Sequence, residues 1–270
     1  MPDTAVSIAG LSFAYQPGRW ILRDCNAAVG SGQIFSILGP NGCGKTTLLK
    51  LMLGALTPSE GHLATSGRTA FVPQLFQVSF DYTALDMVLM GRARQIGLFS
   101  QPAKHDEAAA LEALDRLGMA DFARRPFHEL SGGQRQLVIL SRALAAQAEI
   151  LILDEPTSAL DLKNQALVLE WITRLSCRDG LTIIFTTHHP HHALTVSDAS
   201  LLMLGPERYV VGPANEVMTE DNLAALYGVP LKRLTFEHGD HSVETFVPVL
   251  QLRSAPSRPG EAISQRPERA

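Results

Sequence analysis

Residues 39–46 read Gly-Pro-Asn-Gly-Cys-Gly-Lys-Thr, and this stretch decides the fold. It matches the phosphate-binding pattern G-x-x-x-x-G-K-[ST] at every fixed position. Its glycines permit a tight turn whose backbone amides point at a phosphate, and the helix that begins near Lys45 adds the positive end of its dipole. The charge of Lys45 suits the β- and γ-phosphates of a nucleotide, and the hydroxyl of Thr46 suits Mg²⁺.

The flanking residues support this interpretation. Residues 33–38 read as a short buried strand that leads into the loop, and residues 47–53 read as an apolar-faced helix that ends at Gly54. The plainer alternative is a glycine-rich turn that binds nothing. Because strand, loop and helix are in register, the sequence favours a phosphate site. Cys43 lies at the start of this helix, where a thiolate is favoured, so we expect it to be thiol-reactive.

Composition limits the class of protein. The chain has 270 residues, 46% of them hydrophobic, which suffices for one compact α/β domain with a minor appendage. A net charge of −4 and the lack of a Lys/Arg-rich run argue against nucleic-acid binding. The 3 cysteines are far apart, which indicates reduced thiols. The sequence shows neither a signal peptide nor a run of about 20 apolar residues, so we expect a soluble cytoplasmic protein.

Short strands are expected before and after the phosphate loop. Residues 6–15 look like strand material interrupted at Gly10, and further strands are expected around 21–22 and at 69–74. No internal repeat is visible, and the phosphate loop occurs once.

The second half of the chain indicates the fold class. From about residue 81 to 147 the pattern is helical, and strands at 149–153 and 181–186 then enclose a helix at 164–175. Strands that alternate with helices predict a parallel sheet covered on both faces, with the helical stretch inserted beside it. Residues 252–270 are rich in Pro, Ser, Arg and Glu, so we expect a disordered tail.

Two adjacent carboxylates follow an apolar strand. Residues 149–153 lead directly into Asp154 and Glu155, at the end of a buried strand where ligands bind in open α/β folds. Asp154 suits a Mg²⁺ site reached through water, and Glu155 suits orientation or deprotonation of an attacking water. A simple strand-to-loop transition is the alternative, and the upstream phosphate loop argues against it.

Residues 130–134 read Leu-Ser-Gly-Gly-Gln and open the next helix. Ser131 and Gln134 have capping-box spacing, so an ordinary helix cap is one interpretation. The two glycines between them weaken a helix and need a reason. Close approach of their amides to an anion supplies one.

With these motifs the chain resembles the ATP-binding subunit of ABC transporters, from Val6 to about Leu250. The Leu-Ser-Gly-Gly-Gln stretch resembles that family's signature motif. The resemblance implies an α/β fold: a P-loop NTPase (RecA-like) core with an N-terminal antiparallel β-subdomain and an inserted α-helical subdomain. It places the ATP-binding domain at 1–250, the helical subdomain at about 80–147 and the tail at 251–270.

Four further positions match the family. Tyr15 resembles the aromatic residue that stacks on adenine, Gln74 the glutamine that senses Mg²⁺ and γ-phosphate, and His188 the switch histidine that contacts γ-phosphate. Residues 158–161 resemble the D-loop that touches the facing subunit. The plainer alternatives are a strand tyrosine, a solvated glutamine and a helix start capped by Asp161.

The resemblance thus implies an ATPase site that uses ATP and Mg²⁺. The implied catalytic residues are Glu155, His188 and Gln74. The implied Mg²⁺ ligands are Thr46, Gln74 and Asp154. The implied nucleotide contacts are Tyr15, Gly39, Asn41, Gly42, Cys43, Gly44, Lys45, Thr46, Thr47, Ser131, Gly132, Gly133 and Gln134.

Residues 188–192 read His-His-Pro-His-His, which invites a metal-site interpretation. No paired Cys or carboxylate with zinc-like spacing accompanies them, so the sequence argues against it. Pro190 is better read as the start of a helix that carries the later histidines on its surface.

The resemblance also implies partners. One chain carries one phosphate loop and one signature, so a homodimer is expected to hold two ATP molecules between its subunits. Two transmembrane permease subunits, and indirectly a periplasmic substrate-binding protein, would place the chain peripherally at the cytoplasmic face of the inner membrane. Phe76, Val78, Phe80 and Tyr82 are candidates to line the docking groove; ordinary core packing is the alternative.

Two stretches resemble ATPases of iron-chelate and cobalamin importers, namely residues 86–92 and 219–230. Residues 91–92 with 96–99, 185–190 and 244–248 are similar to the molybdate/tungstate branch. The expected function is therefore ATP-driven import of a metal chelate or an oxyanion.

Two other classes stay open. One is a non-transport ABC ATPase of translation or DNA repair, which usually has two cassettes or a coiled-coil insertion. This chain shows one cassette and no sustained heptads. The other is a P-loop kinase or binding module that needs no dimer, against which the signature motif speaks.

Overall fold

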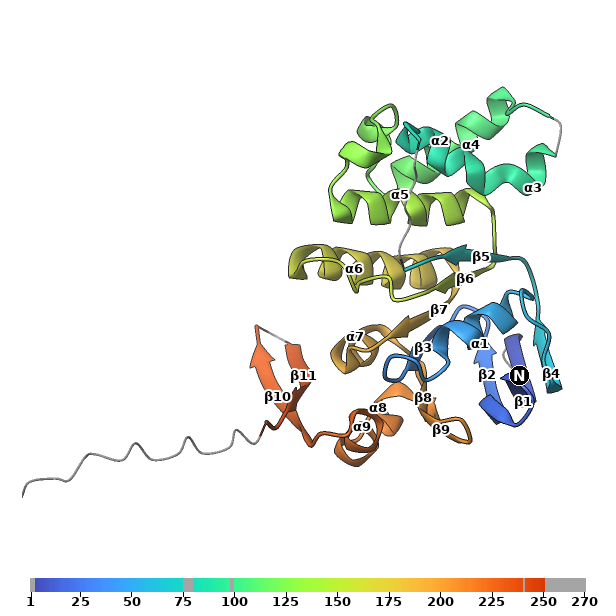
Figure 1. Ribbon diagram of the computed structural model, residues 1–270. Coiled ribbons are helices and arrows are strands. Elements are labelled where there is room, and N and C mark those ends of the chain that lie inside the picture. The colour runs from blue at the N-terminus through green and yellow to red at the C-terminus, as the bar shows by residue number, and fades with distance from the viewer. Residues whose placement is uncertain (1–2, 75–79, 98–99, 240, 251–270) are drawn as a thin grey trace, which may run out of the picture.

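A six-stranded sheet runs through the centre of the molecule, with strand order β5-β6-β7-β3-β8-β9 (Figure 1). The computed structural model describes residues 3–74, 80–97, 100–239 and 241–250. The strands of this sheet are β5 (Thr69–Val72), β6 (Ile150–Leu153), β7 (Thr182–Thr187), β3 (Ile34–Leu38), β8 (Ala199–Gly205) and β9 (Arg208–Pro213). The first five are parallel and β9 is antiparallel. The carboxyl ends of the parallel strands therefore meet along one edge, as predicted.

The central strands are buried on both faces, which explains their continuous apolar sequences. In β6, Leu151 and Leu153 pack into one hydrophobic cluster, whereas Ile150 and Ile152 pack into another on the opposite face. This alternation follows from the two-residue period of a strand. It divides the core between the layer with α6 (Leu162–Asp179) and the layer with α1 (Lys45–Met52).

An antiparallel sheet of order β2-β1-β4 covers the second layer. Its strands are β1 (Thr4–Gln16), β2 (Arg19–Gly30) and β4 (Glu60–Thr65). The sequence predicted an interruption at Gly10, but β1 is continuous there. Gly10 has φ 57°, and the pairing register with β2 shifts between Ile8 and Leu11, so the glycine forms a bulge that bends one strand.

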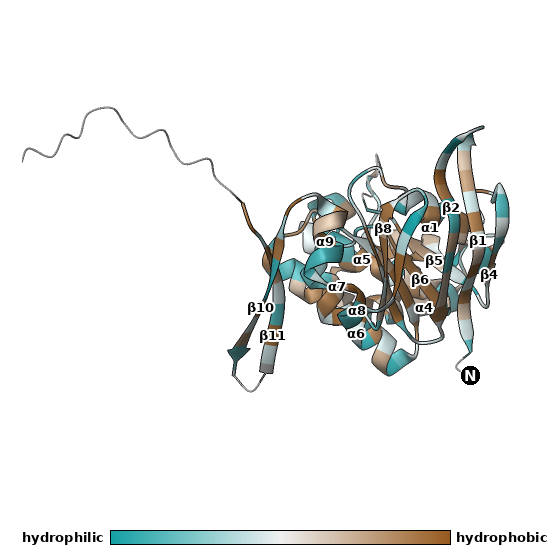
Figure 2. Cartoon of the chain, turned by 90° about the horizontal axis from the view of Figure 1, so that it is seen from below, coloured by the Kyte–Doolittle hydropathy of each residue, from teal (hydrophilic) through white to brown (hydrophobic). Residues whose placement is uncertain are grey.

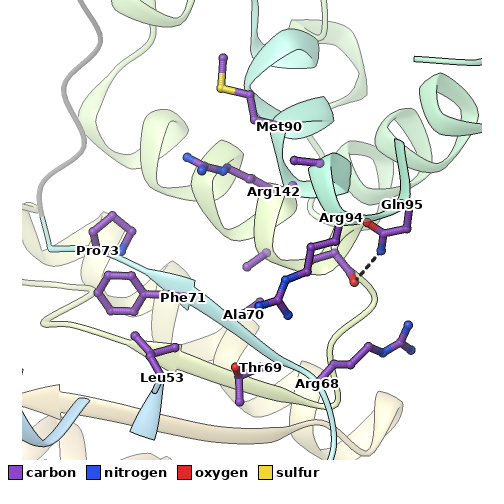
Figure 3. A pocket seen from close by; sticks show the side chains of 14 residues that line it. Leu53, Arg68, Thr69, Ala70, Phe71, Pro73, Met90, Arg94, Gln95 and Arg142 are labelled. Carbon is purple, nitrogen blue, oxygen red and sulfur yellow. Dashed lines mark hydrogen bonds between the residues drawn. The ribbon is translucent and has the colours of Figure 1, made fainter. Parts of the chain in front are cut away.

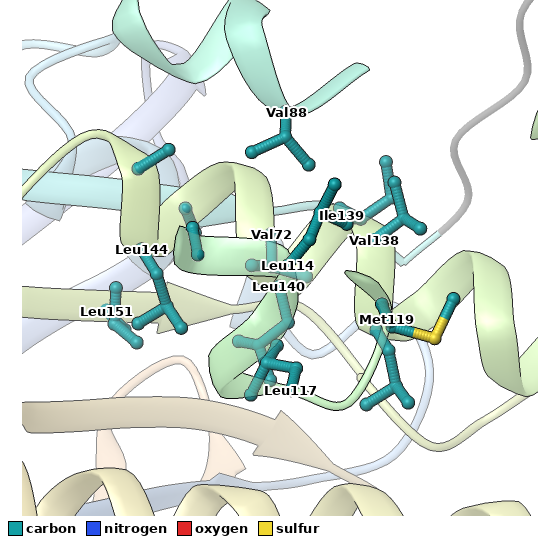
Figure 4. Packing of buried hydrophobic residues seen from close by; sticks show 14 of the residues in the cluster. Val72, Val88, Leu114, Leu117, Met119, Val138, Ile139, Leu140, Leu144 and Leu151 are labelled. Atoms are coloured by element: carbon teal, nitrogen blue, oxygen red, sulfur yellow. The ribbon is translucent and has the colours of Figure 1, made fainter. Parts of the chain in front are cut away.

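A helical block lies between β5 and β6 in sequence and caps the sheet in Figure 1. Its elements are α2 (Ala84–Leu89), η1 (Met90–Arg92), α3 (Ala93–Ile96), α4 (Lys104–Arg116), η2 (Ala120–Phe122), η3 (Phe127–Glu129) and α5 (Gly132–Ala145). A cavity of about 620 Å³ opens between this block and β5 (Figure 3). Within the helical block, Leu114, Val138 and Leu140 pack with the rest of one apolar cluster (Figure 4).

The C-terminal part of the described chain holds a hairpin that the sequence did not predict. After α7 (Pro190–Val196), α8 (Ala214–Val217) and α9 (Glu220–Tyr227), strands β10 (Leu231–His238) and β11 (His241–Pro248) pair antiparallel. Figure 2 shows this hairpin beside α7 and α9, away from the brown strands of the core. Leu231 and Phe246 anchor it in a third apolar cluster. The expectation of a disordered tail concerns residues outside the described part of the chain.

No helix in the described part of the chain is long and apolar enough to cross a membrane.

Candidate nucleotide site

The phosphate loop connects β3 to α1 at the carboxyl edge of the sheet. Gly42 and Gly44 have φ angles of 81° and 108°, a region that residues with a Cβ rarely adopt. The side chain of Lys45 is buried and folds back over the loop. Its Nζ atom donates to the carbonyl oxygens of Gly39, at 2.9 Å, and Pro40, at 3.2 Å. The loop thus holds the ammonium group inside its own turn.

Asp154 lies where β6 ends, directly beside α1. Its Oδ2 atom accepts a hydrogen bond from Thr46 Oγ1 at 3.0 Å, and its Oδ1 atom accepts one from Thr186 Oγ1 at 2.7 Å. A carboxylate and a hydroxyl are the hard oxygen ligands that Mg²⁺ prefers, usually together with phosphate oxygens. This pair therefore fits a Mg²⁺ site.

Glu155 is the point at which the other polar side chains converge. Its carboxylate is buried and lies 3.3 Å from Lys45 Nζ, 3.1 Å from Gln74 Nε2 and 3.1 Å from His188 Nδ1. The backbone of Glu155 has φ 44°, and its amide donates to Thr186 Oγ1 at 2.8 Å. The site therefore joins residues from four separate parts of the sequence.

Four of these residues, Lys45, Thr46, Gln74 and Glu155, line a cavity of about 430 Å³, whereas Asp154 and His188 do not line it. The lining residues are Tyr15, Ile21, Asn41, Gly42, Gly44, Lys45, Thr46, Thr47, Gln74 and Glu155. The ring of Tyr15 is 58% exposed at the cavity rim and packs edge-on against Phe13, with ring centroids 4.9 Å apart. Its hydroxyl lies 3.4 Å from Thr47 Oγ1. An exposed ring above a phosphate loop is available for stacking on a base.

Sequence reasoning missed Ile21 and Thr186. Ile21 lines the cavity, and Thr186 binds both Asp154 and the amide of Glu155. The only signal for Thr186 was its place near the end of an apolar strand, two residues before His188.

The signature residues lie elsewhere. Ser131 caps α5, with its Oγ atom accepting from the amide of Gln134 at 3.3 Å, and Gln134 Oε1 accepting from the amide of Ser131 at 2.9 Å. Ser131 and Gly132 are exposed, whereas Gly133 is buried against α6. Within the described part of the chain, none of these four residues lines the cavity. One copy of the chain therefore does not bring the signature to the phosphate loop.

The helix cap that was the alternative interpretation of residues 158–161 is present on α6: Asp161 Oδ1 accepts from the amide of Asn164 at 2.8 Å. Ser158, at the start of the same segment, accepts from Gln74 Nε2 at 3.2 Å. This bond links the candidate D-loop to the candidate γ-phosphate sensor.

Pro190 begins α7, as predicted. The prediction that the later histidines lie on its surface is wrong for His192, which is buried with its Nδ1 atom 3.1 Å from Thr157 Oγ1. Among the described residues no group of three His, Cys, Asp or Glu side chains could hold a metal ion.

The expected thiolate at Cys43 is also wrong. Burial raises the pKa of this thiol above its usual value, and the opposing effects of Lys45 and nearby backbone amides are smaller. Desolvation of the charged form outweighs the helix N-terminus here.

The expected docking groove is only partly described. Phe76 and Val78 lie outside the described residues, Phe80 is 70% exposed and Tyr82 is half-buried. Phe71, Pro73, Met90 and Arg94 contribute to the walls of the cavity in Figure 3, whereas Phe80 and Tyr82 do not line it.

The fold and the site together define a P-loop nucleotide-binding protein of the RecA-like type with an inserted helical block. The model of the ABC transporter family matches residues 22–158. The chain belongs to the ABC transporter family, as one of its ATP-binding, ATP-hydrolysing subunits. The predicted fold class and family are thereby confirmed.

Three similar proteins cover between 77% and 92% of this chain. The molybdate import ATP-binding protein MolC of Haemophilus influenzae is 39% identical over 247 residues, which cover 92% of this chain and 97% of the relative. One chain of an inward-facing ABC transporter assigned to the metal-chelate type has a TM-score of 0.89 at 38% identity, over 92% of this chain and 99% of that chain. A dimeric ATP-binding cassette bound to ADP and phosphate has a TM-score of 0.66 at 26% identity, over 77% of this chain and 98% of that chain.

Proposed function

We propose that this chain powers the import of a molybdenum or tungsten oxyanion or of a metal chelate. A molybdate import protein and a metal-chelate type transporter, at 39% and 38% identity, support this range of cargo. In this proposal the chain binds nucleotide and does not contact the cargo. The class of cargo is therefore inferred only from these similar proteins.

The convergence of three side chains on Glu155 is the observation that carries the proposed reaction. In the proposed step Glu155 orients a water molecule and takes its proton as the water oxygen bonds to the γ-phosphorus. The bond from that phosphorus to the bridging oxygen breaks, and ADP leaves with the electron pair. Lys45 stabilises the charge on the phosphate oxygens, and Gln74 and His188 hold the carboxylate in place.

Thr46 and Asp154 are the residues proposed to hold Mg²⁺, because their oxygens lie 3.0 Å apart beside the loop. When bound, Mg²⁺ neutralises charge on the phosphates of ATP. Thr186, which donates to the second oxygen of Asp154, keeps that carboxylate turned toward Thr46.

The proposed active form is a homodimer with two ATP molecules at its interface. The exposed N-terminus of α5, with Ser131 and Gly132, suits an anion presented by a second copy. A dimeric cassette bound to ADP and phosphate, to which this chain is similar, supports the formation of a dimer. ATP would hold the two copies together, and loss of the γ-phosphate would release them.

The proposed membrane partners are two permease subunits, which would keep the chain at the cytoplasmic face. The cavity in Figure 3 is a candidate seat for a permease segment, since it joins the helical block to Pro73, the neighbour of Gln74. Reversing the charge of Arg94 in this cavity should lower uptake and leave ATP hydrolysis by the purified chain unchanged. Arg124→Glu, at an exposed site elsewhere in the helical block, is the matched control.

Uptake by a strain that lacks this chain tests the function. The cell content of molybdenum, tungsten and iron should be measured by mass spectrometry after growth with molybdate, tungstate or a ferric chelate. Wild-type chain should restore one of these contents and Glu155→Gln should not. Equal contents of all three metals with and without the chain would contradict the proposal.

A further inference from the structure

His192 is a buried polar side chain that none of the roles above uses. It lies on α7 and is 3% exposed. Its Nδ1 atom is 3.1 Å from the hydroxyl oxygen of Thr157, which is 2% exposed. A hydrogen bond between two fully buried groups is costly to break, because neither group can turn to water instead.

Thr157 follows Glu155 by two residues, so this bond fixes the segment that carries the candidate catalytic carboxylate. The backbone of Glu155 has φ 44°, an uncommon conformation for a residue with a side chain. Such a conformation persists when its surroundings hold it from both sides. The amide of Glu155 is held by Thr186 Oγ1 at 2.8 Å, and His192 holds the segment beyond it.

The same helix is joined to the candidate switch histidine. His188 precedes α7 by two residues and contacts Glu155 directly. The ring of His189 lies between its neighbours, with centroids 4.1 Å from that of His188 and 4.8 Å from that of His192. His192 therefore links the start of α7, with its two adjoining histidines, to the segment behind Glu155.

We propose that His192 is a positioning residue that keeps Glu155 and His188 in register for attack on the γ-phosphate. This inference rests on the proposed role of Glu155. His192 does not line the nucleotide cavity, so its loss should slow turnover and leave ATP binding nearly unchanged.

The proposed bond needs a neutral imidazole that keeps one tautomer. Burial lowers the pKa of His192 to about 3, and the nearby rings of His191, His189 and His188 act in the same direction. His192 therefore stays uncharged throughout the pH range of an ordinary assay. Replacing it by a residue that does not titrate should leave the shape of the pH–rate profile unaltered.

Two substitutions separate a hydrogen-bonding role from a packing role. His192→Leu fills the site and removes the bond, whereas His192→Asn keeps a polar group near the Nδ1 position and leaves a void. We expect kcat to fall about tenfold in His192→Leu with the KM for ATP within about twofold of wild type, because a small displacement of a catalytic group is costly. His192→Asn should recover most of kcat despite a lower melting temperature.

The partner residue supplies an independent test. Thr157→Val removes the hydroxyl and should reproduce the loss of kcat, whereas Thr157→Ser should retain activity. The double variant His192→Leu/Thr157→Val should be no slower than either single one, because both remove the same bond. Equal activity of His192→Leu and wild type, or activities that follow only the melting temperature, would overturn the proposal. A wild-type chain that fails to hydrolyse ATP would instead count against the function itself.

Discussion

Glu155 illustrates how one residue gathers the chemistry of the site, since three polar side chains meet its carboxylate. Glu155→Gln keeps the size of the side chain and removes its charge and its ability to accept a proton. We expect ATP binding to persist while hydrolysis falls by a factor of about 100 or more. An ATP-bound dimer should then accumulate on gel filtration. Glu207→Gln, at an exposed site that does not line the cavity, should behave as wild type. Normal phosphate release by Glu155→Gln would show that another group acts as the base.

Cys43 shows that burial can outweigh a helix N-terminus. Since burial raises the pKa of its thiol, Cys43 should react with iodoacetamide more slowly than the exposed Cys177 at neutral pH. ATP should slow the reaction of Cys43 further, because nucleotide would cover the loop, and should not affect Cys177. Mass spectrometry of peptides from a time course measures both rates. Faster labelling of Cys43 than of Cys177 would contradict the expected protonation state.

His192 should also make the fold sensitive to acid. Its pKa is about 3 in the folded protein and about 6.5 in an unfolded chain, so between these values the unfolded state binds a proton that the folded state does not. Its contribution to stability is thus fully present above pH of about 6.5 and is lost as the pH falls toward 3. The urea midpoint of wild type should drop more steeply from about pH 7 to about pH 5 than that of His192→Asn. If the urea midpoints of wild type and His192→Asn change equally with pH, His192 makes no such contribution to stability.

At the scale of elements, Gly133 sets the approach of α5 to α6. A Cβ atom at this position would lie 2.0 Å from Asn164 Oδ1, so Asn164 would have to change rotamer and give up its 2.8 Å hydrogen bond to Asp161 Oδ1, and the Cβ atom of Asn164 would still lie only 3.1 Å away. Gly133→Ala should lower the free energy of unfolding by about 1–3 kcal/mol. At Gly132 the nearest atom would be 3.7 Å away, so Gly132→Ala should be neutral or slightly stabilising. Urea unfolding without nucleotide compares the two, and equal stability would contradict the close packing.

Sequence reasoning located the elements that carry motifs, and it also located β7 and α6 from their apolar patterns. The phosphate loop and the carboxylates after β6 are found because their chemistry demands fixed spacing. The spacing of these residues in the sequence does not predict that they lie close together, because their contact depends on the order of the strands in the sheet. β6 pairs with β7 with Leu153 opposite Phe185, and this register brings Thr186 to Asp154. No local pattern encodes that pairing.

The β10–β11 hairpin was missed for a related reason. Only Leu231 is buried along β10, so the strand lacks a regular apolar alternation. Its support is tertiary: Leu231 and Phe246 pack among residues of α7 and α9, and Lys232 pairs with Glu220 at 2.6 Å. Such strands are defined by what they pack against more than by their own propensity. The turn glycine Gly239, with φ 61°, was the one local signal.

At the scale of the whole molecule, the proposed ATP site is divided between two surfaces of one chain. Lys45 lies in the nucleotide cavity, whereas Ser131 lies at the exposed start of α5 and does not line it. A two-fold symmetric pair of chains would form two identical sites, each with a phosphate loop from one copy and a signature from the other. A defect in the phosphate loop of every copy, or in the signature of every copy, should abolish ATP hydrolysis. Neither defect alters the surface that carries the other motif.

This division predicts complementation between inactive variants. Lys45→Ala chains lack a working phosphate loop, and Ser131→Arg chains lack a working signature, so each homodimer should be inactive. In a mixed dimer one site would carry both defects, and the other would combine an intact loop with an intact signature. An equal mixture forms mixed dimers about half the time, so with independent sites the rate of phosphate release should reach about a quarter of wild type. A mixture of Lys45→Ala with Glu155→Gln chains extends the test. It should stay inactive, because both defects lie on the side of the site that carries the phosphate loop. Differently tagged chains verify that mixed dimers form. If the mixture of Lys45→Ala and Ser131→Arg chains then releases no phosphate, the signature of one copy does not complete the site of the other.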